Sequence, residues 1–286
     1  MKKILVSSFY KYIYLDNLEE FQKEHLEFCK NLDIKGKILI SKEGINGTVS
    51  GIKDQIYKYE TNLLSHKEFS DLKFKRTLAE IHPFRKTIVR IRNEIVSSGF
   101  GISAKNFGKH ISPYELNKLY DNKEDFVIVD ARNNYESKIG RFKNAVTPDI
   151  ETFREFKTLV KQLEGFKNKK VVLYCTGGVR CEKASALLIN EGFKDVNQVD
   201  GGIINYIQQY PGIHFEGRCF VFDDRLSIET GDSKDITICE RCHEPCGEYI
   251  NCFNIRCDKL FVCCRECREK FYSTCSKECR NLVNSI

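Results

Sequence analysis

The sequence has no run of about 18 apolar residues, the length that a membrane-spanning helix needs. Its first residues carry two lysines and then only a short apolar stretch, without the longer apolar segment and small-residue cleavage site of a secretory signal. It also contains no internal repeat and no low-complexity tract. These absences exclude a helical membrane protein, and we expect a cytoplasmic chain with no membrane partner.

The composition is that of a soluble globular protein. The 286 residues are 41% hydrophobic and 30% charged, and this length suits about two domains. The net charge of +6 is unevenly distributed, because residues 1–110 carry 20 basic and 13 acidic side chains. The N-terminal third is therefore predicted to meet an anionic partner.

Cysteine is abundant, with 14 residues, ten of them in the last 48 positions. In a reducing compartment this density favours metal ligands over structural disulfides, and a redox-active or disulfide cluster is the alternative. Eight of these cysteines form four short-spaced pairs, which suit two tetrahedral zinc sites of four thiolates each: Cys239 and Cys242, Cys252 and Cys257, Cys264 and Cys267, Cys275 and Cys279.

The partners of these pairs are open from the sequence. Joining the first pair to the third and the second to the fourth gives a cross-braced arrangement, and sequential pairing is the alternative. Cys246 and Cys263 are left over, and His243 is a possible substitute for one thiolate.

Three parts are predicted along the chain. Residues 1–96 alternate strands and helices in the order βαββαβ, typical of a ferredoxin-like α+β domain. Two of its short strands are expected to flank a glycine-rich turn at Gly44–Gly47. After a linker at about 94–111, residues 112–212 alternate buried strands with helices, which predicts an α/β domain with a parallel sheet. Residues 213–286 end in the cysteine-rich tail.

The clearest catalytic signal is the loop Cys175-Thr-Gly-Gly-Val-Arg180, between a buried strand and a helix. Chemistry in open parallel sheets lies beyond the carboxyl ends of the strands. Gly177 and Gly178 let backbone N–H groups converge on one point, and Arg180 and the helix N-terminus add positive potential. All of these favour a nucleophilic Cys175 thiolate. The alternative, an inert buried cysteine, leaves the two glycines and the arginine unexplained.

Cys181 follows Arg180 at the helix start. It is a candidate resolving thiol, able to form a disulfide with an oxidised Cys175. The alternative is that it replaces a helix-capping serine.

A basic stretch with interleaved Phe74 and Phe84 is a candidate RNA-binding surface, suited to phosphates and to stacking of a loop base. A solvated strand surface is the alternative reading, and Asn46 is a possible further contact. The basic residues are Lys73, Lys75, Arg76, Arg85, Lys86, Arg90 and Arg92, with Lys42 in the nearby turn.

The middle of the chain resembles rhodanese domains. The first similar segments are Asp130-Ala-Arg132, Glu136, Gly140-Arg-Phe and Asn144-Ala145, and the later ones are Val171–Arg180, Gly192-Phe193 and Asp200–Ile203. Rhodanese loops have four residues between cysteine and arginine, as here, whereas related phosphatase loops have five. A phosphatase is therefore disfavoured. Tyr206 stands where many rhodaneses carry tryptophan, which we interpret as a core substitution.

The whole chain resembles the rhodanese-like tRNA uridine hydroxylases of bacteria. The similarity lies in Lys42–Thr48, Cys175–Ser185, Gly217–Arg225 and the cysteine-rich tail. It implies O2-dependent conversion of the wobble uridine of tRNA to 5-hydroxyuridine, with Cys175 as the active-site cysteine. The residues alone do not predict an oxygenase, since the six histidines show no two-His-one-carboxylate pattern and no dinucleotide fingerprint is present. They identify no electron donor; an oxidised or persulfide form of Cys175 as redox intermediate is our hypothesis.

Two other functions are compatible with parts of the sequence. The rhodanese-like loop by itself favours a sulfurtransferase or persulfide carrier. The basic N-terminal region by itself favours an RNA-binding adaptor without catalysis, for which replacing Cys175 would have no effect.

Overall fold

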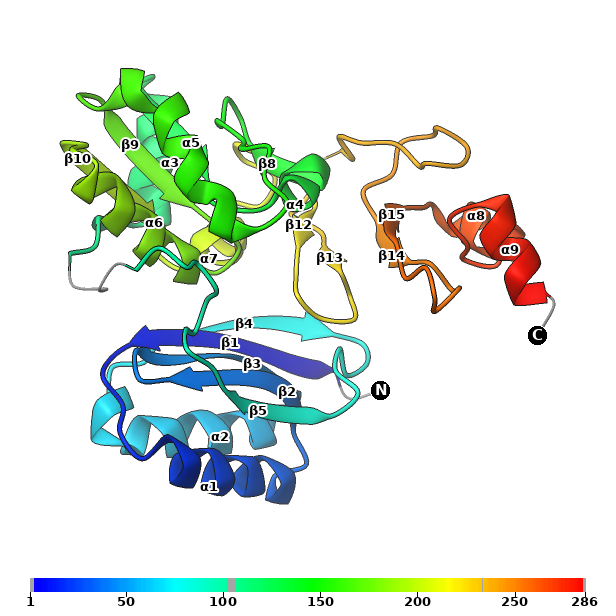
Figure 1. The fold of residues 1–286 in the computed structure, drawn as a ribbon, viewed down its shortest axis with the longest axis horizontal. Coiled ribbons are helices and arrows are strands. Elements are labelled where there is room, and N and C mark those ends of the chain that lie inside the picture. Colours follow the sequence, from blue (N-terminus) through cyan, green and yellow to red (C-terminus); the bar gives the residue numbers. More distant parts are fainter. Residues whose placement is uncertain (1–2, 102–105, 233, 285–286) are drawn as a thin grey trace.

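The computed structural model describes residues 3–101, 106–232 and 234–284. It confirms the predicted fold class, with an N-terminal α/β domain, a second domain built on a parallel sheet, and a cysteine-rich tail (Figure 1). None of the helices in these ranges is long and apolar enough to cross a membrane. The predicted linker at 94–111 lies partly outside the described residues, because 102–105 are not among them.

The N-terminal domain is a five-stranded sheet covered by two helices on one face (Figure 1). The strand order is β4-β1-β3-β2-β5, with β5 parallel to β2 and the other neighbours antiparallel. The apolar face of the sheet packs against the helices through residues such as Phe9, Ile38 and Tyr59. The elements are β1 (Ile4–Tyr12), α1 (Leu18–Asn31), β2 (Lys35–Ser41), β3 (Gly44–Gly51), α2 (Lys53–Ser65), η1 (Lys67–Phe69), β4 (Phe74–Ala79) and β5 (Thr87–Ile91).

The predicted glycine-rich turn is wrong in position. The chain turns at Lys42 and Glu43, and Gly44–Gly47 already belongs to β3. Gly47 is required there by packing across the sheet, because an added Cβ would lie 2.7 Å from the ring of Phe9. Gly44 has φ 141°, and its added Cβ would lie against the carbonyl of Lys11. These glycines therefore serve close strand packing rather than a turn.

The second domain has a four-stranded sheet in the order β6-β10-β9-β7, with all neighbours parallel. Buried apolar side chains fill both faces of the sheet. The elements are β6 (Lys109–Ile111), α3 (Pro113–Asp121), β7 (Phe126–Asp130), α4 (Asn134–Ile139), β8 (Gly140–Phe142), η2 (Phe153–Glu155), α5 (Phe156–Gln162), η3 (Glu164–Phe166), β9 (Lys170–Tyr174), α6 (Val179–Asn190), β10 (Asp195–Val199) and α7 (Gly202–Gln209).

The segment that follows the second domain, residues 213–230, packs against both domains. Its strand β11 (Phe215–Gly217) pairs with β8, and β12 (Cys219–Phe220) pairs with β13 (Ser227–Ile228). Between β12 and β13 the loop reaches the N-terminal domain, where the Asp224 N–H donates to the Pro83 carbonyl at 2.9 Å. The Arg225 guanidinium donates to the Thr77 hydroxyl at 3.0 Å. The loop therefore contacts both domains.

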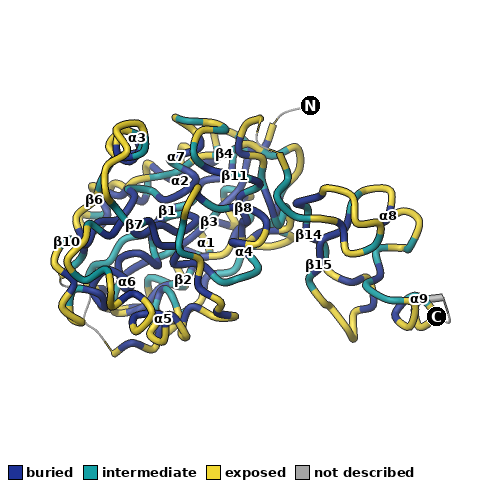
Figure 2. Tube along the Cα trace, turned by 90° about the horizontal axis from the view of Figure 1, so that it is seen from above, coloured by how far each residue is buried: buried dark blue, intermediate teal, exposed yellow. Residues whose placement is uncertain are grey.

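The cysteine-rich tail projects from the side of the two domains (Figures 1 and 2). Eleven buried residues form the cluster around its thiols, and four of them are cysteines of the four pairs. The apolar residues of the tail in this cluster are Tyr249, Phe261 and Val262. Such a small apolar core needs a further constraint. The elements are β14 (Tyr249–Asn251), β15 (Leu260–Val262), α8 (Arg265–Lys270) and α9 (Lys277–Asn284).

Candidate active site

Cys175 lies at the carboxyl end of β9, directly before helix α6. The N–H of Gly178 donates to its Sγ at 3.1 Å. Gly178 caps the helix with φ 101°, and a Cβ added there would lie 2.8 Å from the hydroxyl of Tyr10. A Cβ at Gly177 would meet only Lys75, at 3.8 Å. Gly178 is therefore the glycine on which this loop geometry depends.

The surroundings of Cys175 favour its thiolate. Burial alone would raise the pKa, since the side chain is 1% exposed. Hydrogen bonds from Cys181 and from the N–H groups of Arg180 and Gly178, together with the Arg180 charge, outweigh burial and lower the pKa to about 5. At neutral pH the thiolate therefore predominates.

This predicts the pH dependence of alkylation. A thiol with a lowered pKa becomes nucleophilic as pH rises through that pKa, so modification of Cys175 by iodoacetamide should reach half its maximum near pH 5 and a plateau by neutral pH. Mass spectrometry of the Cys175 peptide after timed alkylation measures this. Burial raises the pKa of Cys29 to about 12, so its peptide is the internal control. A midpoint for Cys175 near the ordinary value of 9 would contradict the account.

Arg180 stabilises the Cys175 thiolate and also forms an ion pair with Glu136. Its guanidinium donates to both carboxylate oxygens of Glu136, at 2.6 and 2.8 Å, and both side chains are buried. A bidentate buried pair of this kind is geometrically rigid. The Thr176 hydroxyl also donates to Glu136, at 3.3 Å. Glu136 therefore holds the arginine in place beneath the thiol loop.

Cys181 faces Cys175 rather than the helix end. Its thiol is fully buried, and helix α6 begins without a side-chain cap. Burial and the hydrogen bond to Cys175 raise the pKa of Cys181 well above its usual value. The thiol therefore stays protonated and donates to the thiolate, which does not support the helix-cap alternative. Its use as a resolving thiol stays a prediction.

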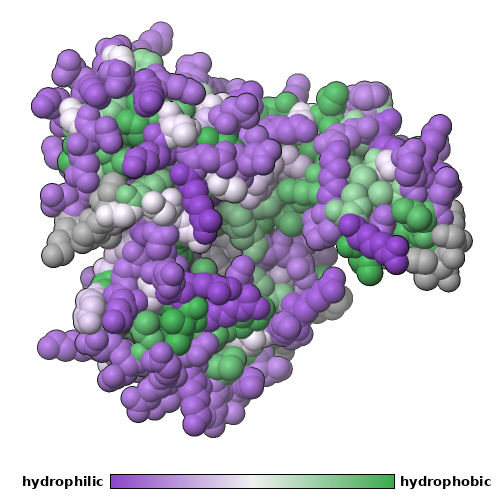
Figure 3. Space-filling view, viewed as in Figure 1, coloured by the Kyte–Doolittle hydropathy of each residue, from purple (hydrophilic) through white to green (hydrophobic). Residues whose placement is uncertain are grey.

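Cys175 opens into a cleft of about 350 Å³ between the two domains. Figure 3 shows the molecule hollowed between the N-terminal domain below and the second domain above. The thiol loop forms one wall, and the helix-free face of the N-terminal sheet forms the other. The principal lining residues are Ser8, Tyr10, Lys37, Leu39, Asn46, Thr48, Lys75, Phe84, Ile95, Cys175, Thr176, Gly177, Val179, Arg180, Phe222 and Arg225.

Most of the residues opposite Cys175 are missed by sequence reasoning. Ser8, Tyr10 and Thr48 alternate with core residues on β1 and β3, which places them on the open face beside Asn46, a residue predicted from the sequence as a possible RNA contact. That alternation is visible in the sequence, but the docking of the second domain on this face is not. The loop residue Phe222 comes from Gly217–Arg225, a segment known from the resemblance only as a motif.

Side chains across the interface fix the position of this wall. The Tyr10 hydroxyl donates to Glu182 at 3.0 Å, and the Tyr12 hydroxyl donates to the carbonyl of Val179 at 3.2 Å. Lys183, which is buried, pairs with Glu43 at 2.9 Å and also with Glu94. These bonds join the N-terminal domain directly to helix α6.

The predicted RNA-binding residues do not form one surface. Lys75 lies inside the cleft, 4.7 Å above the Tyr10 ring, where burial lowers its pKa to about 8 against the opposing charges of Cys175 and Asp200. Arg76 points to the helix face, where it pairs with Glu60 of α2, because alternate residues of β4 face opposite sides. Lys73 pairs with Asp200 at 3.1 Å.

The remaining basic residues lie nearer the open face. Arg90 lies in β5 and is the register partner of the cleft residue Leu39, while Lys86 directly precedes the strand and Arg92 directly follows it. Within the described residues none of these three side chains forms an ion pair. Arg85 lies 3.8 Å from Asp224 with both groups exposed, and Lys42 is exposed in the β2–β3 turn.

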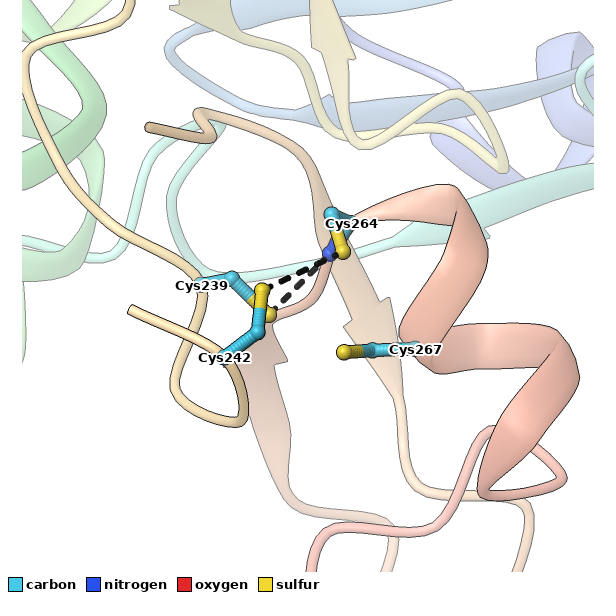
Figure 4. Close-up of side chains that lie close together, drawn as sticks. All are labelled: Cys239, Cys242, Cys264 and Cys267. Atoms are coloured by element: carbon cyan, nitrogen blue, oxygen red, sulfur yellow. Dashed lines mark hydrogen bonds between the residues drawn. The ribbon is translucent and has the colours of Figure 1, made fainter. Parts of the chain in front are cut away.

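The tail thiols gather in two groups of four. Cys239 and Cys242 come together with Cys264 and Cys267 (Figure 4), and Cys252 and Cys257 come together with Cys275 and Cys279. This is the cross-braced grouping rather than the sequential one. His243 is in neither group, nor are Cys246 and Cys263.

The spacing of the thiols suits a tetrahedral metal ion. Four sulfurs at about 2.3 Å from a central zinc lie about 3.8 Å from one another. The Cys242 and Cys264 sulfurs are 3.6 Å apart, and Cys275 lies 3.6 Å from Cys257 and 3.8 Å from Cys279. All four ligand atoms of each group lie within 4.8 Å of one another. Each cluster can therefore hold a metal ion.

Comparison with known proteins gives matches for all three parts of the chain. Residues 4–95 match the family model "UPF0176 acylphosphatase like domain", residues 112–209 match "Rhodanese-like domain" and residues 216–280 match "Rhodanase C-terminal". A tRNA uridine(34) hydroxylase of Bacillus licheniformis is 40% identical over 280 residues, which are 95% of this chain and 87% of the relative. The chain belongs to the tRNA uridine(34) hydroxylase family.

Further members of this family are equally similar. The tRNA uridine(34) hydroxylase of Bacillus mycoides is 42% identical, with 98% of this chain and 90% of the relative covered. That of Bacillus pumilus is 41% identical, with 100% and 91% covered. The family resemblance seen in the sequence is thereby confirmed. Because the match spans both walls of the cleft, it includes the N-terminal sheet as well as the thiol loop.

Proposed function

We propose that this protein is an oxidoreductase that hydroxylates uridine at position 34 of tRNA, in the cleft that contains Cys175. The observation that carries the proposal is the 40–42% identity, over 95% or more of the chain, to proteins named tRNA uridine(34) hydroxylase. The product is 5-hydroxyuridine and O2 is the co-substrate. Cys175 supplies the thiolate on which the reaction depends.

The cleft supports this function physically. Enzymes that act on a base take it out of the stack into a pocket, where side chains hold its edge and face. A cleft of about 350 Å³ is within the usual size of small-molecule sites. Phe84 and Phe222 in its lining offer faces for stacking, and Lys37 offers charge for a phosphate. A sulfurtransferase needs only the thiol loop and leaves this second wall without a role.

Nucleoside analysis separates the two functions. We expect mass spectrometry of tRNA from cells lacking the gene to show loss of 5-hydroxyuridine and its derivatives, restored by the wild-type gene. Thiolated nucleosides should be unchanged. Loss of thiolated nucleosides with normal 5-hydroxyuridine would instead establish the sulfur-carrier function and refute the hydroxylase.

Arg90 in β5 and Arg92 directly after it, together called the β5 face, are proposed to bind tRNA phosphates. Each phosphate contact with single-stranded RNA contributes about 0.7 to the slope of log affinity against log salt. The double variant Arg90→Ala, Arg92→Ala should therefore bind tRNA more weakly and lower the slope by about 1.4, as measured by fluorescence anisotropy over a salt series.

A matched control lies on the opposite face of the same domain. Lys53 and Lys58 are exposed on helix α2, which covers the other side of the sheet. The double variant Lys53→Ala, Lys58→Ala removes the same charge and should leave the slope unchanged. Equal losses in both double variants would mean that net charge alone, and not the β5 face, governs RNA binding.

The two thiol clusters are proposed to hold one structural zinc ion each. The first is bound by Cys239, Cys242, Cys264 and Cys267, and the second by Cys252, Cys257, Cys275 and Cys279. Four thiolates close each site, so the metal stabilises the tail and takes no part in the reaction.

A further inference from the structure

We propose that Asn46 recognises the substrate base as uracil, and that the carbonyl of Ile95 fixes the direction of its amide for this task. The inference rests on the proposed function and names the residue that selects the base. Asn46 lies on the open face of β3, between its register partners Tyr10 on β1 and Leu39 on β2. It is half-buried and lines the same cleft as Cys175.

The orientation of the Asn46 amide is determined by one hydrogen bond. Its Nδ2 donates to the carbonyl oxygen of Ile95 at 2.9 Å. Ile95 is itself held in place, since it is fully buried and its N–H donates to the Glu43 carboxylate at 2.8 Å. Rotating the amide by half a turn would bring Oδ1 against this carbonyl, where two acceptors meet without a proton. The amide is therefore locked.

The lock leaves a fixed pattern of donors and acceptors toward the cleft. Within the described part of the chain no group donates to Asn46 Oδ1, and one Nδ2 hydrogen remains after the bond to Ile95. An acceptor beside a donor matches uracil, whose N3–H lies between two carbonyl oxygens. Cytosine presents an acceptor at N3 and would face Oδ1 with a lone pair. For a base held in one orientation by its attachment to the RNA chain, a freely rotating asparagine pairs with either uracil or cytosine, whereas a locked one pairs only with uracil.

The neighbouring hydroxyls lack this property. Ser8 and Thr48 are on the same wall, and their hydroxyl oxygens lie 3.0 Å apart. A hydroxyl rotates to donate or accept as its partner requires, so it does not distinguish uracil from cytosine. The Asn46 amide, by contrast, has its direction fixed by the bond to the Ile95 carbonyl. Its position also suits the reaction, because the ring edge opposite N3 carries C5 and C6, which then face the thiol loop.

Binding of defined RNA loops tests the role of Asn46. The protein is the full chain with Cys175→Ser, so that no turnover occurs. The probes are anticodon stem-loops that differ only at position 34, which holds uridine, cytidine or N3-methyluridine. We expect uridine to bind about tenfold to a hundredfold more tightly than either of the others, the range for a bidentate base contact. Adding Asn46→Ala should reduce this ratio to about 1.

The ratio of affinities for the three loops does not change when a substitution simply lowers the fraction of folded protein, because all loops are compared on the same protein. Gln22→Ala is the matched control. Gln22 also donates a side-chain N–H to a backbone carbonyl, that of Val89 at 2.8 Å, but from helix α1 on the other face of the sheet. This variant should keep the full preference for uridine.

The outcomes separate this inference from the proposed function. An unchanged uridine preference in the Asn46→Ala protein would overturn the role of Asn46, as would equal binding of all three loops by the protein with Asn46 intact. Either result leaves the proposed function standing if tRNA nucleosides still lose 5-hydroxyuridine in cells lacking the gene. If those nucleosides are unchanged, the proposed function itself fails.

Discussion

Cells that carry only the Cys175→Ser variant should have no more 5-hydroxyuridine in their tRNA than cells that lack the gene. The serine hydroxyl is not ionised at neutral pH, whereas the environment of Cys175 lowers the pKa of its thiol to about 5. Loss of the reacting nucleophile of an enzyme costs on the order of 10³-fold or more in rate. Mass spectrometry of total tRNA nucleosides measures the result.

The control for this variant is another buried cysteine. Cys29 lies in the core of the N-terminal domain, away from the cleft, and burial raises the pKa of its thiol to about 12. Cys29→Ala removes a thiol of similar burial and should support normal 5-hydroxyuridine. Full 5-hydroxyuridine in the Cys175→Ser cells would contradict the role of the thiolate and favour an RNA-binding adaptor.

Removal of metal should unfold the tail and leave the two domains folded. Structural zinc in small thiolate sites contributes on the order of 10–16 kcal/mol to folding. The tail has only a small apolar cluster besides its cysteines. The purified full chain should therefore contain two zinc ions by elemental analysis. After chelation, limited proteolysis should cut rapidly within residues 234–284 and leave the preceding domains intact.

Two single variants make the metal test specific. Cys242→Ser removes an exposed thiol of the first cluster and should reduce the content to one zinc ion per chain. Cys246→Ala removes a buried thiol that belongs to neither cluster and should leave both ions bound. A full chain without metal whose tail resists proteolysis would refute the zinc assignment.

The thiol loop and the metal-binding cysteines of the tail could be predicted because the residues that act together are only a few positions apart in the sequence. Cys175, two glycines and Arg180 follow one another along the chain, so a strand end and a helix start suffice to bring them together. The cysteine pairs are equally local. Spacing does not say which pairs meet, because that depends on how β15 and α8 return toward the first pair; the sequence therefore left two groupings open.

The second wall of the cleft could not be predicted in the same way. Its residues come from separate strands, and their meeting with Cys175 depends on docking through contacts such as that of Tyr10 with Glu182. The basic stretch was predicted as one surface because the alternation of side chains along a strand was not considered. Lys75 and Arg76 are adjacent in sequence, yet one enters the cleft and the other pairs with Glu60 behind the sheet. Charge alone did not reveal this division.

The most direct test of the central claim is the mass of the anticodon-loop fragment of tRNA from cells grown under isotopically heavy O2. Cells with the wild-type gene should yield fragments in which the nucleoside at position 34 has gained one heavy oxygen atom. Cells with Cys175→Ser should yield the unmodified fragment. An added sulfur in place of oxygen, or an identical fragment from the two strains, would contradict the account.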